Sequence, residues 1–335
     1  VERRLAAEDP YVIRMKVPEG SSTFSDVIRG EVTFDHEEVD DQILLKSDGF
    51  PTYHLAVVID DHEMQISTIL RGEEWISSTP TQLILFKMFG WEAPKFAHVP
   101  LLLNPDKTKL SKRQGDVSAA SYLERGYLKE ALVNFLATLG YNPTGDREIY
   151  TMEELIELFD LTKVKKSGAV VNFEKLDWMN KQYLQDLPLD TVVERLQPFL
   201  KEKQEDIERM VDVERQRATT LIDIAQALPD YATLPDYETP ILVWKHADAR
   251  ETVDMLNMAK AYIQDASLEN LEQIETAIKD WINQHEWKMG AMLHPLRVSL
   301  AGRKTSPSPF ELLYVYGKEE SLRRINIAID RLNGS

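Results

Sequence analysis

The stretch Ile66-Ser-Thr-Ile-Leu-Arg-Gly72 opens a pattern that predicts the fold of the first part of the chain. Its apolar run predicts a short buried strand that ends at the Arg-Gly pair. The following Ser78-Thr-Pro80 can cap and start a helix, and Gly90 suits the left-handed position beyond a helix end. A second apolar run, Val99–Leu103, predicts another strand. A strand, a helix and a strand in this order indicate an α/β unit with a parallel sheet.

The residues before this unit predict further strands. Within residues 1–46, Tyr11–Val17 alternates apolar and charged side chains, as a half-buried strand does. Val27–Phe34 resembles a second short strand around Gly30. The apolar run Leu55–Ile59 suits a buried strand, which would place Asp60 directly after its end.

Polar side chains follow the ends of three predicted strands, at Asp60, Arg71 and Asn104. Open α/β sheets bind ligands beyond the carboxyl ends of their strands, so we expect these residues at a ligand-binding edge. A simpler reading of the pair Asp60-Asp61 is that at least one of the two carboxylates caps or turns the chain.

The segment Lys107-Thr-Lys-Leu-Ser-Lys-Arg113 carries four cations and two hydroxyls between the last predicted strand and a helical region. Lysine side chains suit the charge that develops on a triphosphate during nucleotidyl transfer. A solvated basic turn is the alternative, and it is favoured for the loop taken alone because short motifs match by chance. The order of the surrounding elements shifts the interpretation towards phosphate binding.

From about residue 116 onward the pattern is helical. Ser118 is predicted to cap a short helix that stops at Gly126, and Asp190 to cap one that reaches Leu200. Pro188 marks a predicted boundary, and Leu228–Pro240, with three prolines, predicts a linker. Three more helices are predicted at Leu128–Leu139, Met152–Phe159 and Phe173–Leu184.

The composition bounds the class of protein. The chain has 335 residues, of which 43% are hydrophobic, enough for at least two cores. No run approaches the roughly 18 apolar residues that a membrane helix needs. The absence of cysteine excludes disulfides and thiolate metal sites, so we expect no zinc and no metal site. A cytoplasmic protein that meets Mg²⁺ only with a nucleotide is the expectation, and the start at Val1 reads as the middle of a longer chain.

The formal net charge of −17 argues against a general nucleic-acid binder, because phosphate contacts dominate such affinity. Net charge does not describe local fields, however. Basic residues cluster within an otherwise acidic chain at Lys107–Arg113, Lys163–Lys166, Arg215 with Arg217, and Arg303 with Lys304. Basic islands on an acidic protein favour one structured polyanion over DNA in general.

Blocks along the whole chain resemble bacterial glutamyl-tRNA synthetases, a family of class I aminoacyl-tRNA synthetases. The blocks that resemble the second half of the catalytic domain are Asp48–Ala56, Asp60-Asp61, Ile69–Trp75, Thr79–Gln82 and Pro105–Arg113. Those that resemble the following domain and the end of the anticodon-binding region are Tyr127–Leu136, Phe173–Asn180 and His294-Pro-Leu-Arg297 with Gly302. The motif HIGH and the first Rossmann half of the family have no counterpart in this sequence.

The resemblance implies roles for residues of the first half. The segment Lys109-Leu-Ser-Lys-Arg113 matches the family's KMSKS loop, which makes Lys109, Ser111, Lys112 and Arg113 the catalytic candidates. ATP would contact Lys112, Leu102 and Glu74, and glutamate would contact Tyr53, Val57 and Arg71. Many relatives carry Asn where this chain has Val57, which removes a side-chain hydrogen bond there.

Each of these assignments has a simpler alternative. Tyr53 could be a core aromatic whose hydroxyl has a partner. Arg71 and Glu74 could form a surface ion pair with each other. For Trp75, packing is the favoured role.

In the second half, the resemblance implies that Arg217, Arg297, Ser306 and Pro307 contact the tRNA anticodon. Arginine can stack on an unstacked base or bind its edge, which is how single-stranded RNA loops are recognised. Without the resemblance, a solvated helix face is the preferred interpretation of these arginines. Lys163, Lys165 and Lys166 could contact the tRNA stem, although a charge run is usually only solvated.

The fold class expected is an α/β remnant of a Rossmann-type class I synthetase catalytic domain, followed by an all-α stem-contact and anticodon-binding region. Five domains are predicted: 1–46, the tail of the inserted acceptor-binding domain; 47–115, the second half of the Rossmann domain with its KMSKS-type loop; 116–188, a helical stem-contact domain; and 189–240 and 241–335, two helical anticodon-binding subdomains.

The implied function is that of a glutamate–tRNA ligase, which activates glutamate with ATP and transfers it to tRNA(Glu). The expected partners are tRNA(Glu), L-glutamate and ATP with Mg²⁺, without DNA or a membrane, and the expected state is a monomer. We expect the chain alone to form no glutamyl-adenylate. Arg217 favours an enzyme that uses only tRNA(Glu) over one that also uses tRNA(Gln). The alternatives are a non-catalytic tRNA-binding module and a glutaminyl-tRNA synthetase, whose family ends in β-barrels.

Overall fold

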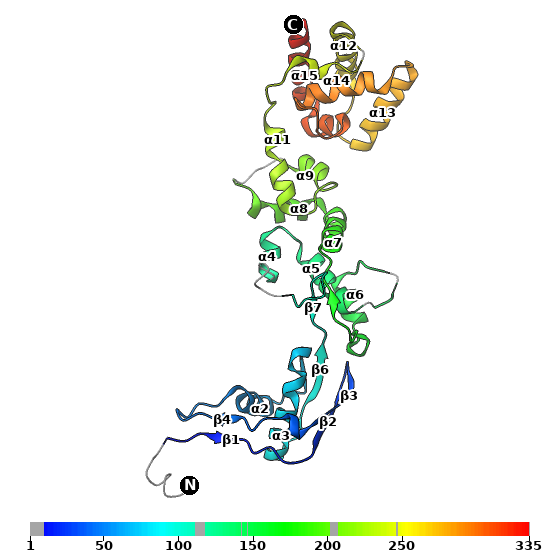
Figure 1. Cartoon of the computed structure of the whole chain (residues 1–335). Coiled ribbons are helices and arrows are strands. Elements are labelled where there is room, and N and C mark those ends of the chain that lie inside the picture. Colours follow the sequence, from blue (N-terminus) through cyan, green and yellow to red (C-terminus); the bar gives the residue numbers. More distant parts are fainter. Residues whose placement is uncertain are drawn as a thin grey trace. The chain divides into compact units, whose positions relative to one another are not determined.

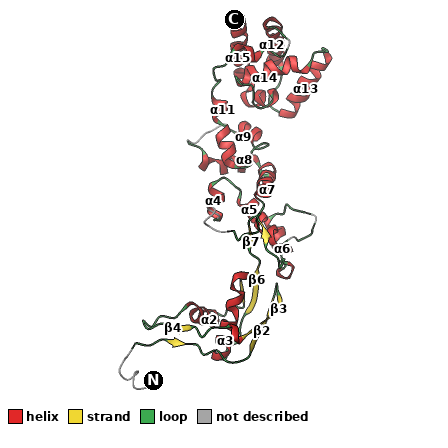
Figure 2. Ribbon diagram, viewed as in Figure 1, coloured by secondary structure: helices red, strands yellow, loops and turns green. Residues whose placement is uncertain are grey.

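The computed structural model of the chain describes residues 10–110, 118–141, 143–145, 147–201, 207–245 and 247–334. Contacts divide it into two compact units, which are described separately. The first unit is formed by Val1–Ser121 and Lys129–Leu176, and the second by Tyr122–Leu128 and Asp177–Ser335. All strands that the structure describes belong to the first unit, as Figures 1 and 2 show.

The first unit is built around a four-stranded sheet with the strand order β3-β2-β6-β5. Strands β2 and β3 form an antiparallel hairpin, whereas β6 runs parallel to both β2 and β5. Two small two-stranded sheets pair β1 with β4 and β7 with β8. The strands are β1 (Ile13–Arg14), β2 (Ser21–Asp26), β3 (Gly30–Asp35), β4 (Ile43–Leu45), β5 (Thr68–Gly72), β6 (Lys95–Val99), β7 (Leu102–Leu103) and β8 (Ala169–Val170).

The strand predicted to end at Arg71-Gly72 and the helix after it are confirmed as β5 and α3 (Thr79–Phe89), and β6 follows as a strand parallel to β5. Gly90 ends α3 in the left-handed conformation, with φ 73°. Glycine adopts this conformation without a steric clash because it has no Cβ atom. Ser78 occupies the N-cap position without a side-chain capping bond. The single strand predicted at Val99–Leu103 is wrong: Val99 ends β6, and Leu102–Leu103 form the separate strand β7, which pairs with β8. Pro100 follows β6 directly and has no N–H to donate to a ladder.

The predicted strand at Leu55–Ile59 is wrong, because these residues lie in helix α2 (Tyr53–Glu63). A short apolar run fits a buried strand and a buried helix segment equally well, so periodicity alone does not separate them. Val58 is fully buried, and α2 packs against α3. Asp60 therefore lies on a helix, and its prediction as a residue at a strand end is also wrong.

The strands predicted at Tyr11–Val17 and Val27–Phe34 are corrected as well. The first shrinks to β1, whose pairing with β4 shifts register after Ile13. The second is interrupted because residues 27–29 form the turn between β2 and β3. Asp26 Oδ1 accepts the backbone N–H groups of Ile28 and Arg29, which closes this turn, and Gly30 follows with φ 82°.

A hydrophobic core fixes the helices of this unit against its N-terminal strands. The buried members come from the N-terminal strand region, α2 and α3: Met15, Leu44, Val58, Ile84, Leu85 and Phe86. On the sheet itself, Phe24 of β2 packs edge-to-face on Phe96 of β6, with ring centroids 5.5 Å apart.

The remaining helices follow in both units. Ser118 Oγ accepts the N–H of Ser121 at the start of α4, as predicted. Asp190 is not the cap of α8, since the helix already begins after Pro188 and the carboxylate accepts the N–H of Thr191. The α-helices are α4 (Ala119–Glu124), α5 (Lys129–Gly140), α6 (Met152–Leu158), α7 (Phe173–Asp186), α8 (Leu189–Leu196), α9 (Glu208–Glu214), α10 (Leu221–Ala227), α11 (Pro229–Ala232), α12 (Ala249–Asp265), α13 (Leu271–Gln284), α14 (Met289–Ala301) and α15 (Pro309–Asn333).

Short 3-10 helices in the described part of the chain are η1 (His36–Glu38), η2 (Glu73–Ser78), η4 (Leu161–Lys163), η5 (Gln197–Phe199) and η6 (Thr239–Leu242). The stretch Leu228–Pro240, predicted as a linker, contains α11, and both Tyr231 and Tyr237 are buried in the core of the second unit. Pro229 lies at the first helical position, where its missing N–H leaves no bond unmade. The proline signal therefore marks a helix start as well as a loop.

Arg324 lies in the core of the second unit with 1% of its surface exposed. Its Nη1 donates to Leu300 O at 2.7 Å, and its Nη2 donates to Tyr231 O at 3.1 Å. Its Nε pairs with Glu320 at 2.6 Å, and the guanidinium lies 3.8 Å from the Tyr316 ring centroid. Each nitrogen of the buried cation thus has an acceptor, which is the condition for burying a charge. The arginine ties α14, α11 and α15 together.

Glu320 makes the stability of the second unit depend on pH. Hydrogen bonds from Arg323, and then from Arg324, lower the pKa of Glu320 to about 2 from its ordinary value of 4.5, against the opposing effect of burial. A carboxyl whose pKa is lowered on folding stabilises the protein above its unfolded pKa. That stability is lost as the pH falls from about 4.5 towards 2.

We therefore expect Glu320→Gln to flatten the acid limb of the stability curve. The measurement is the urea midpoint of wild type and variant between pH 7 and pH 3, and the difference should shrink as the pH falls. Glu319→Gln, at the exposed neighbouring position, is the matched control. A difference that stays constant with pH would contradict the assignment.

Candidate substrate site and RNA-binding cavity

Three polar side chains form a line across the sheet of the first unit. Strand register brings them together, since Arg71 of β5 is the direct partner of His98 on β6, and Asp26 ends β2 opposite Phe96. His98 Nδ1 lies 2.6 Å from Asp26 Oδ2, and Arg71 Nε donates to His98 Nε2 at 3.0 Å. Asp26 and His98 are almost completely buried. Asp26 therefore fixes the orientation of the His98 ring, and the ring in turn fixes the orientation of the Arg71 guanidinium.

The bonds to its two nitrogens define one protonation state for His98. Arg71 can only donate, so Nε2 of the ring must accept, and the ring proton is on Nδ1 facing Asp26. Burial lowers the pKa of His98, the hydrogen bond to Asp26 opposes this, and the charge of Arg71 lowers it further. Burial raises the pKa of Asp26, but the bonds from His98, Arg29 and Ile28 hold it below its ordinary value. The pair is a carboxylate and a neutral imidazole at neutral pH.

The guanidinium of Arg71 is held on several sides. Its Nη2 donates to Thr79 Oγ1 at 3.0 Å, and the hydroxyl of Thr79 donates to the carbonyl of Trp75. The carbon of the guanidinium lies 5.8 Å from the Trp75 ring and 5.6 Å from the Phe96 ring. Among the described residues, Nη1 of Arg71 has no hydrogen-bond partner. One edge of a rigidly held cation is therefore available to an anion.

Tyr53 and Trp75 lie beside this arginine. Their ring centroids are 5.2 Å apart, and 52% of the Tyr53 surface is exposed. The alternative of a core aromatic for Tyr53 is therefore wrong. Trp75 packs as expected, between Tyr53 and Arg71. Val57 is one turn along α2 from Tyr53, and its apolar side chain packs against the core.

Glu74 contacts the described start of the basic loop, the segment Lys107–Arg113. Its Oε1 lies 3.4 Å from Lys109 Nζ, so the alternative of an ion pair between Arg71 and Glu74 is wrong. The carboxylate folds back over Gly72, where a Cβ would lie 2.0 Å from Glu74 Oε2. Leu102 O accepts the N–H of Leu110, which closes a hairpin from β7 into this loop. Ser111, Lys112 and Arg113 lie outside the described residues.

Sequence reasoning missed several residues of this site: Asp26, His98, Thr79, Arg29 and Glu73. Glu73 pairs with Arg29 and accepts the backbone N–H of Leu101, which links η2 to the segment after β6. The signal available was His98 itself, a polar residue within the otherwise apolar core of a strand. Asn104, predicted at a ligand edge, instead bonds within its own hairpin to Thr108.

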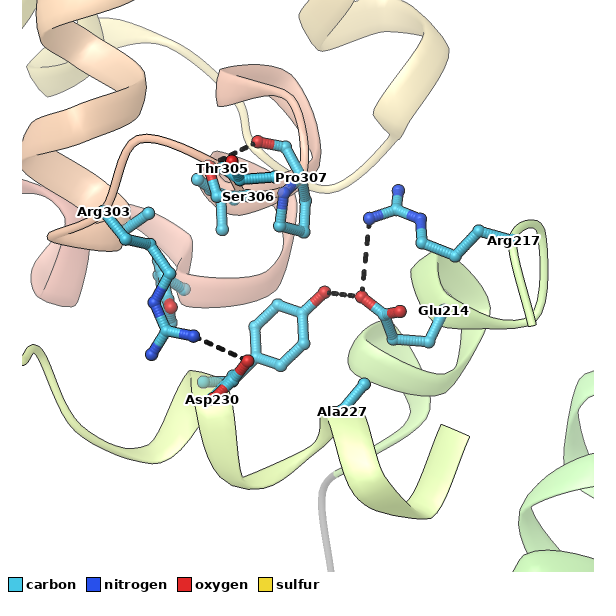
Figure 3. A pocket seen from close by; sticks show the side chains of 12 residues that line it. Glu214, Arg217, Ala227, Asp230, Arg303, Thr305, Ser306 and Pro307 are labelled. Carbon is cyan, nitrogen blue, oxygen red and sulfur yellow. Dashed lines mark hydrogen bonds and ion pairs between the residues drawn. The ribbon is translucent and has the colours of Figure 1, made fainter. Parts of the chain in front are cut away.

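A cavity of about 330 Å³ lies in the second unit. Figure 3 shows Arg217 and Glu214 on one side of it, Arg303 and Asp230 on another, and the segment from Thr305 to Pro307 above. The full lining is Glu214, Arg217, Ala227, Asp230, Tyr231, Ala301, Arg303, Thr305, Ser306, Pro307, Leu312 and Tyr316. The structure thus brings together three of the four residues that the resemblance linked to an anticodon.

The fourth, Arg297, supports the wall of this cavity and is not among its lining residues. Its Nη1 donates to Lys304 O at 2.8 Å and to Ser306 Oγ at 3.1 Å. Arg217, in contrast, pairs with Glu214 and with Glu311. A freely solvated helix face is therefore not the environment of either arginine.

Planar groups line the cavity beside these ion pairs. The hydroxyl of Tyr231 donates to Glu214, and burial, with this bond, raises the pKa of Tyr231, so the phenol stays neutral. Tyr316 and Arg303 complete the wall, and Arg303 pairs with Asp230 at 2.6 Å. Arginine and tyrosine planes around a cavity of this size suit an unstacked nucleobase. The sequence did not indicate Tyr231 or Tyr316 as site residues, because both look like ordinary core residues of helices.

Two family models match the chain. Residues 1–178 match tRNA synthetases class I (E and Q), catalytic domain, and residues 191–329 match an anticodon binding domain. The glutamate–tRNA ligase of Chloroherpeton thalassium is 43% identical, over 99% of this chain and 70% of the relative. That of Prosthecochloris aestuarii is 41% identical, over 99% and 69%.

The chain belongs to the glutamate–tRNA ligase family.

Solved structures agree with this family. A glutamate tRNA ligase from Elizabethkingia meningosepticum, solved in complex with its amino acid, has a TM-score of 0.83 and 35% identity, with 99% of this chain and 70% of that chain covered. Glutamate-tRNA synthetase from Elizabethkingia anophelis has a TM-score of 0.81 at 35% identity, with 98% and 70% covered. The predicted fold class, a class I catalytic portion followed by a helical anticodon-binding region, is confirmed.

The helices of the second half also argue against the alternative of a glutaminyl-tRNA synthetase. That alternative expected β-barrels at the end of the chain, whereas residues 189–334, so far as they are described, form helices and loops. Within the described ranges there is no group of three or more His, Asp or Glu side chains that could hold a metal ion, and no helix long and apolar enough to cross a membrane. The five predicted domain bounds remain a prediction.

Proposed function

We propose that the chain supplies the second half of the activation site and the tRNA-docking region of a glutamate–tRNA ligase. The observation that carries the proposal is the line from Asp26 through His98 to Arg71, which leaves Nη1 of Arg71 open beside the exposed Tyr53. A planar guanidinium can pair with both oxygens of a carboxylate, and holding it in advance reduces the entropy cost of binding. Glutamate is the carboxylate substrate of this family.

We assign roles along the reaction as follows. Arg71 and Tyr53 hold glutamate, and the apolar side of Val57 borders it without a hydrogen bond. Glu74, Lys109 and the edge of Leu102 face ATP, with Ser111, Lys112 and Arg113 continuing the loop towards its phosphates. The side chains of Lys109 and Glu74 already form an ion pair at 3.4 Å. Mg²⁺ enters with ATP, and we assign it no protein ligand.

The reaction has two steps. A carboxylate oxygen of glutamate attacks the α-phosphate of ATP, the bond to the β-phosphate breaks, and pyrophosphate leaves with its electron pair. A ribose hydroxyl at the end of the tRNA then attacks the acyl carbon of the adenylate, its proton is lost, and AMP leaves. Positioning and charge stabilisation carry both steps, since neither forms a bond to a protein side chain.

We assign tRNA recognition to the cavity of the second unit. Arg217, Ser306 and Pro307 contact the anticodon directly, and Arg297 acts by holding the segment that carries Ser306. Lys163, Lys165 and Lys166 remain candidates for the tRNA stem, with Lys166 already donating to Arg29 O at 3.0 Å.

The test is binding of the chain to tRNA(Glu) and to an unrelated tRNA at about 0.15 M salt, because affinities without a stated salt concentration cannot be compared. We expect tRNA(Glu) to bind at least about tenfold more tightly, since contacts to bases discriminate by roughly 1–3 kcal/mol each. Phosphate contacts alone give equal affinities, so equal binding of the two tRNAs would remove the case for anticodon recognition.

A further inference from the structure

Arg217 is held between two carboxylates that come from different helices. Glu214 at the end of α9 lies 3.5 Å from its Nη1, and Glu311 in the first turn of α15 pairs with its Nη2. The arginine side chain is 39% exposed, whereas both glutamates are mostly buried. Part of the Arg217 side chain is therefore exposed to solvent, while two of its guanidinium nitrogens pair with the carboxylates.

We propose that Glu311 is a positioning residue that orients Arg217 for anticodon reading and so sets the discrimination between tRNAs. The proposal rests on the proposed function, in which Arg217 contacts the anticodon. Glu311 is not among the residues that line the cavity. It acts through the arginine.

The orientation of Glu311 is itself fixed. Its Oε2 accepts the backbone N–H of Ser308 at 2.6 Å, and Ser308 Oγ accepts the backbone N–H of Glu311 at 3.2 Å. This reciprocal pair is a capping box that satisfies two free donors at the start of α15. One carboxylate oxygen thus starts the helix while the other holds Arg217. Arg217 therefore cannot move away without breaking its ion pair with a carboxylate that is itself held in place.

The capping box also joins the two arginines of the site through one loop. Ser308 ends the segment that follows α14, and Arg297 holds that segment through Lys304 O and Ser306 Oγ. Arg217 and Arg297 therefore act on the same loop from opposite ends. A long, flexible arginine loses much rotamer freedom when it binds a base, and advance positioning reduces that loss.

If Glu311 acted only through its charge, its removal would strengthen tRNA binding rather than reduce discrimination. Loss of a carboxylate beside an RNA site strengthens attraction to phosphates, so every tRNA would bind more tightly. Positioning predicts instead that the cognate anticodon loses its advantage over a changed one. The ratio of two affinities separates these effects, because non-specific attraction cancels in it.

The variant that tests this is Glu311→Gln. Glutamine fits the same place in a capping box, so the start of α15 is retained, while its amide replaces the charge that faces Arg217. The measurement is the Kd for tRNA(Glu) and for tRNA(Glu) with a substituted anticodon, at one salt concentration. We expect the ratio of these Kd values to fall by about tenfold, the contribution of one good base contact.

Glu269→Gln is the matched control. It removes a carboxylate from another arginine pair of the same unit, that of Arg209, at a side chain that is 75% exposed. Its ratio should equal that of wild type. A Glu311→Gln ratio equal to wild type, with or without a uniform gain in affinity, would overturn the proposal.

A double variant tests whether Glu311 acts through the arginine. In an Arg217→Gln background, Glu311→Gln should cause no further loss of discrimination, because the group it positions is already gone. Additive losses would show an independent role and overturn the proposal. If Glu311→Gln lowers the melting temperature, Arg217→Lys tests the same contact from its other end. The lysine keeps the charge without the planar fork, and an unchanged ratio there also overturns the proposal.

The outcomes keep the two proposals apart. A wild-type chain that does not distinguish the two anticodons contradicts the proposed function itself. A wild type that discriminates, with a Glu311→Gln variant that discriminates equally well, contradicts only the role of Glu311.

Discussion

Asp26→Asn is expected to destabilise the first unit by about 3 kcal/mol, the loss of roughly two hydrogen bonds to a charged group. The carboxylate is buried and accepts the N–H groups of Ile28 and Arg29 on one oxygen, and the N–H and ring of His98 on the other. Asparagine offers a single acceptor oxygen. Its NH₂ group must face either the turn or the imidazole, and both present only donors.

The same variant should disturb Arg71. If the amide NH₂ faces the ring, Nδ1 of His98 must accept, and the proton moves to Nε2, which then meets the N–H of Arg71. Nitrogen-15 NMR of the imidazole reads this directly. In wild type we expect the proton on Nδ1, and a wild-type spectrum with the proton on Nε2 would contradict the whole arrangement.

Stability is best followed by a signal from His98 during a urea titration, because the chain has two units and need not unfold in one step. Asp160→Asn is the matched control, since Asp160 accepts the N–H and hydroxyl of Thr162 in an exposed turn. It should change stability by less than about 0.5 kcal/mol. Equal effects of the two substitutions would show that burial does not matter at Asp26.

Arg324→Met is expected to destabilise the second unit by about 3–5 kcal/mol, the range for breaking a buried ion pair from one side. The loss leaves Leu300 O and Tyr231 O without their buried donor and removes the cation over the Tyr316 ring. Methionine fills part of the volume, so the effect measures the lost polar contacts more than a cavity.

Arg323→Met provides the comparison, because Arg323 binds the same carboxylate. It makes two bonds of 2.6 Å to Glu320, but its side chain is 55% exposed. A surface pair contributes about 0–1 kcal/mol, so this variant should lie within that range. Hydrogen exchange of the α15 amides measures both. Similar losses for the two arginines would contradict the role assigned to burial.

Much of the architecture could be predicted from local signals in the sequence. Ser78-Thr-Pro80 and Gly90 predicted α3 because caps and breakers act through the local backbone. The helical second half followed from apolar spacing in the same way. The mistakes fall where local signals are ambiguous. Leu55–Ile59 fits strand and helix alike, and its contact with α3 settles the choice.

The basic loop, Tyr53, Arg71 and Glu74 were named from the sequence because their residue types and order match those of the family. What the sequence could not supply is which side chains touch. Arg71 pairs with His98 through strand register, across 27 residues of chain, and Asp26 reaches His98 across 72. In the second unit Arg217 and Glu311 are 94 residues apart. Such pairings depend on the packing of distant elements, so only the tertiary structure decided that Arg71 is held by a buried neutral histidine and Arg217 by the first turn of α15.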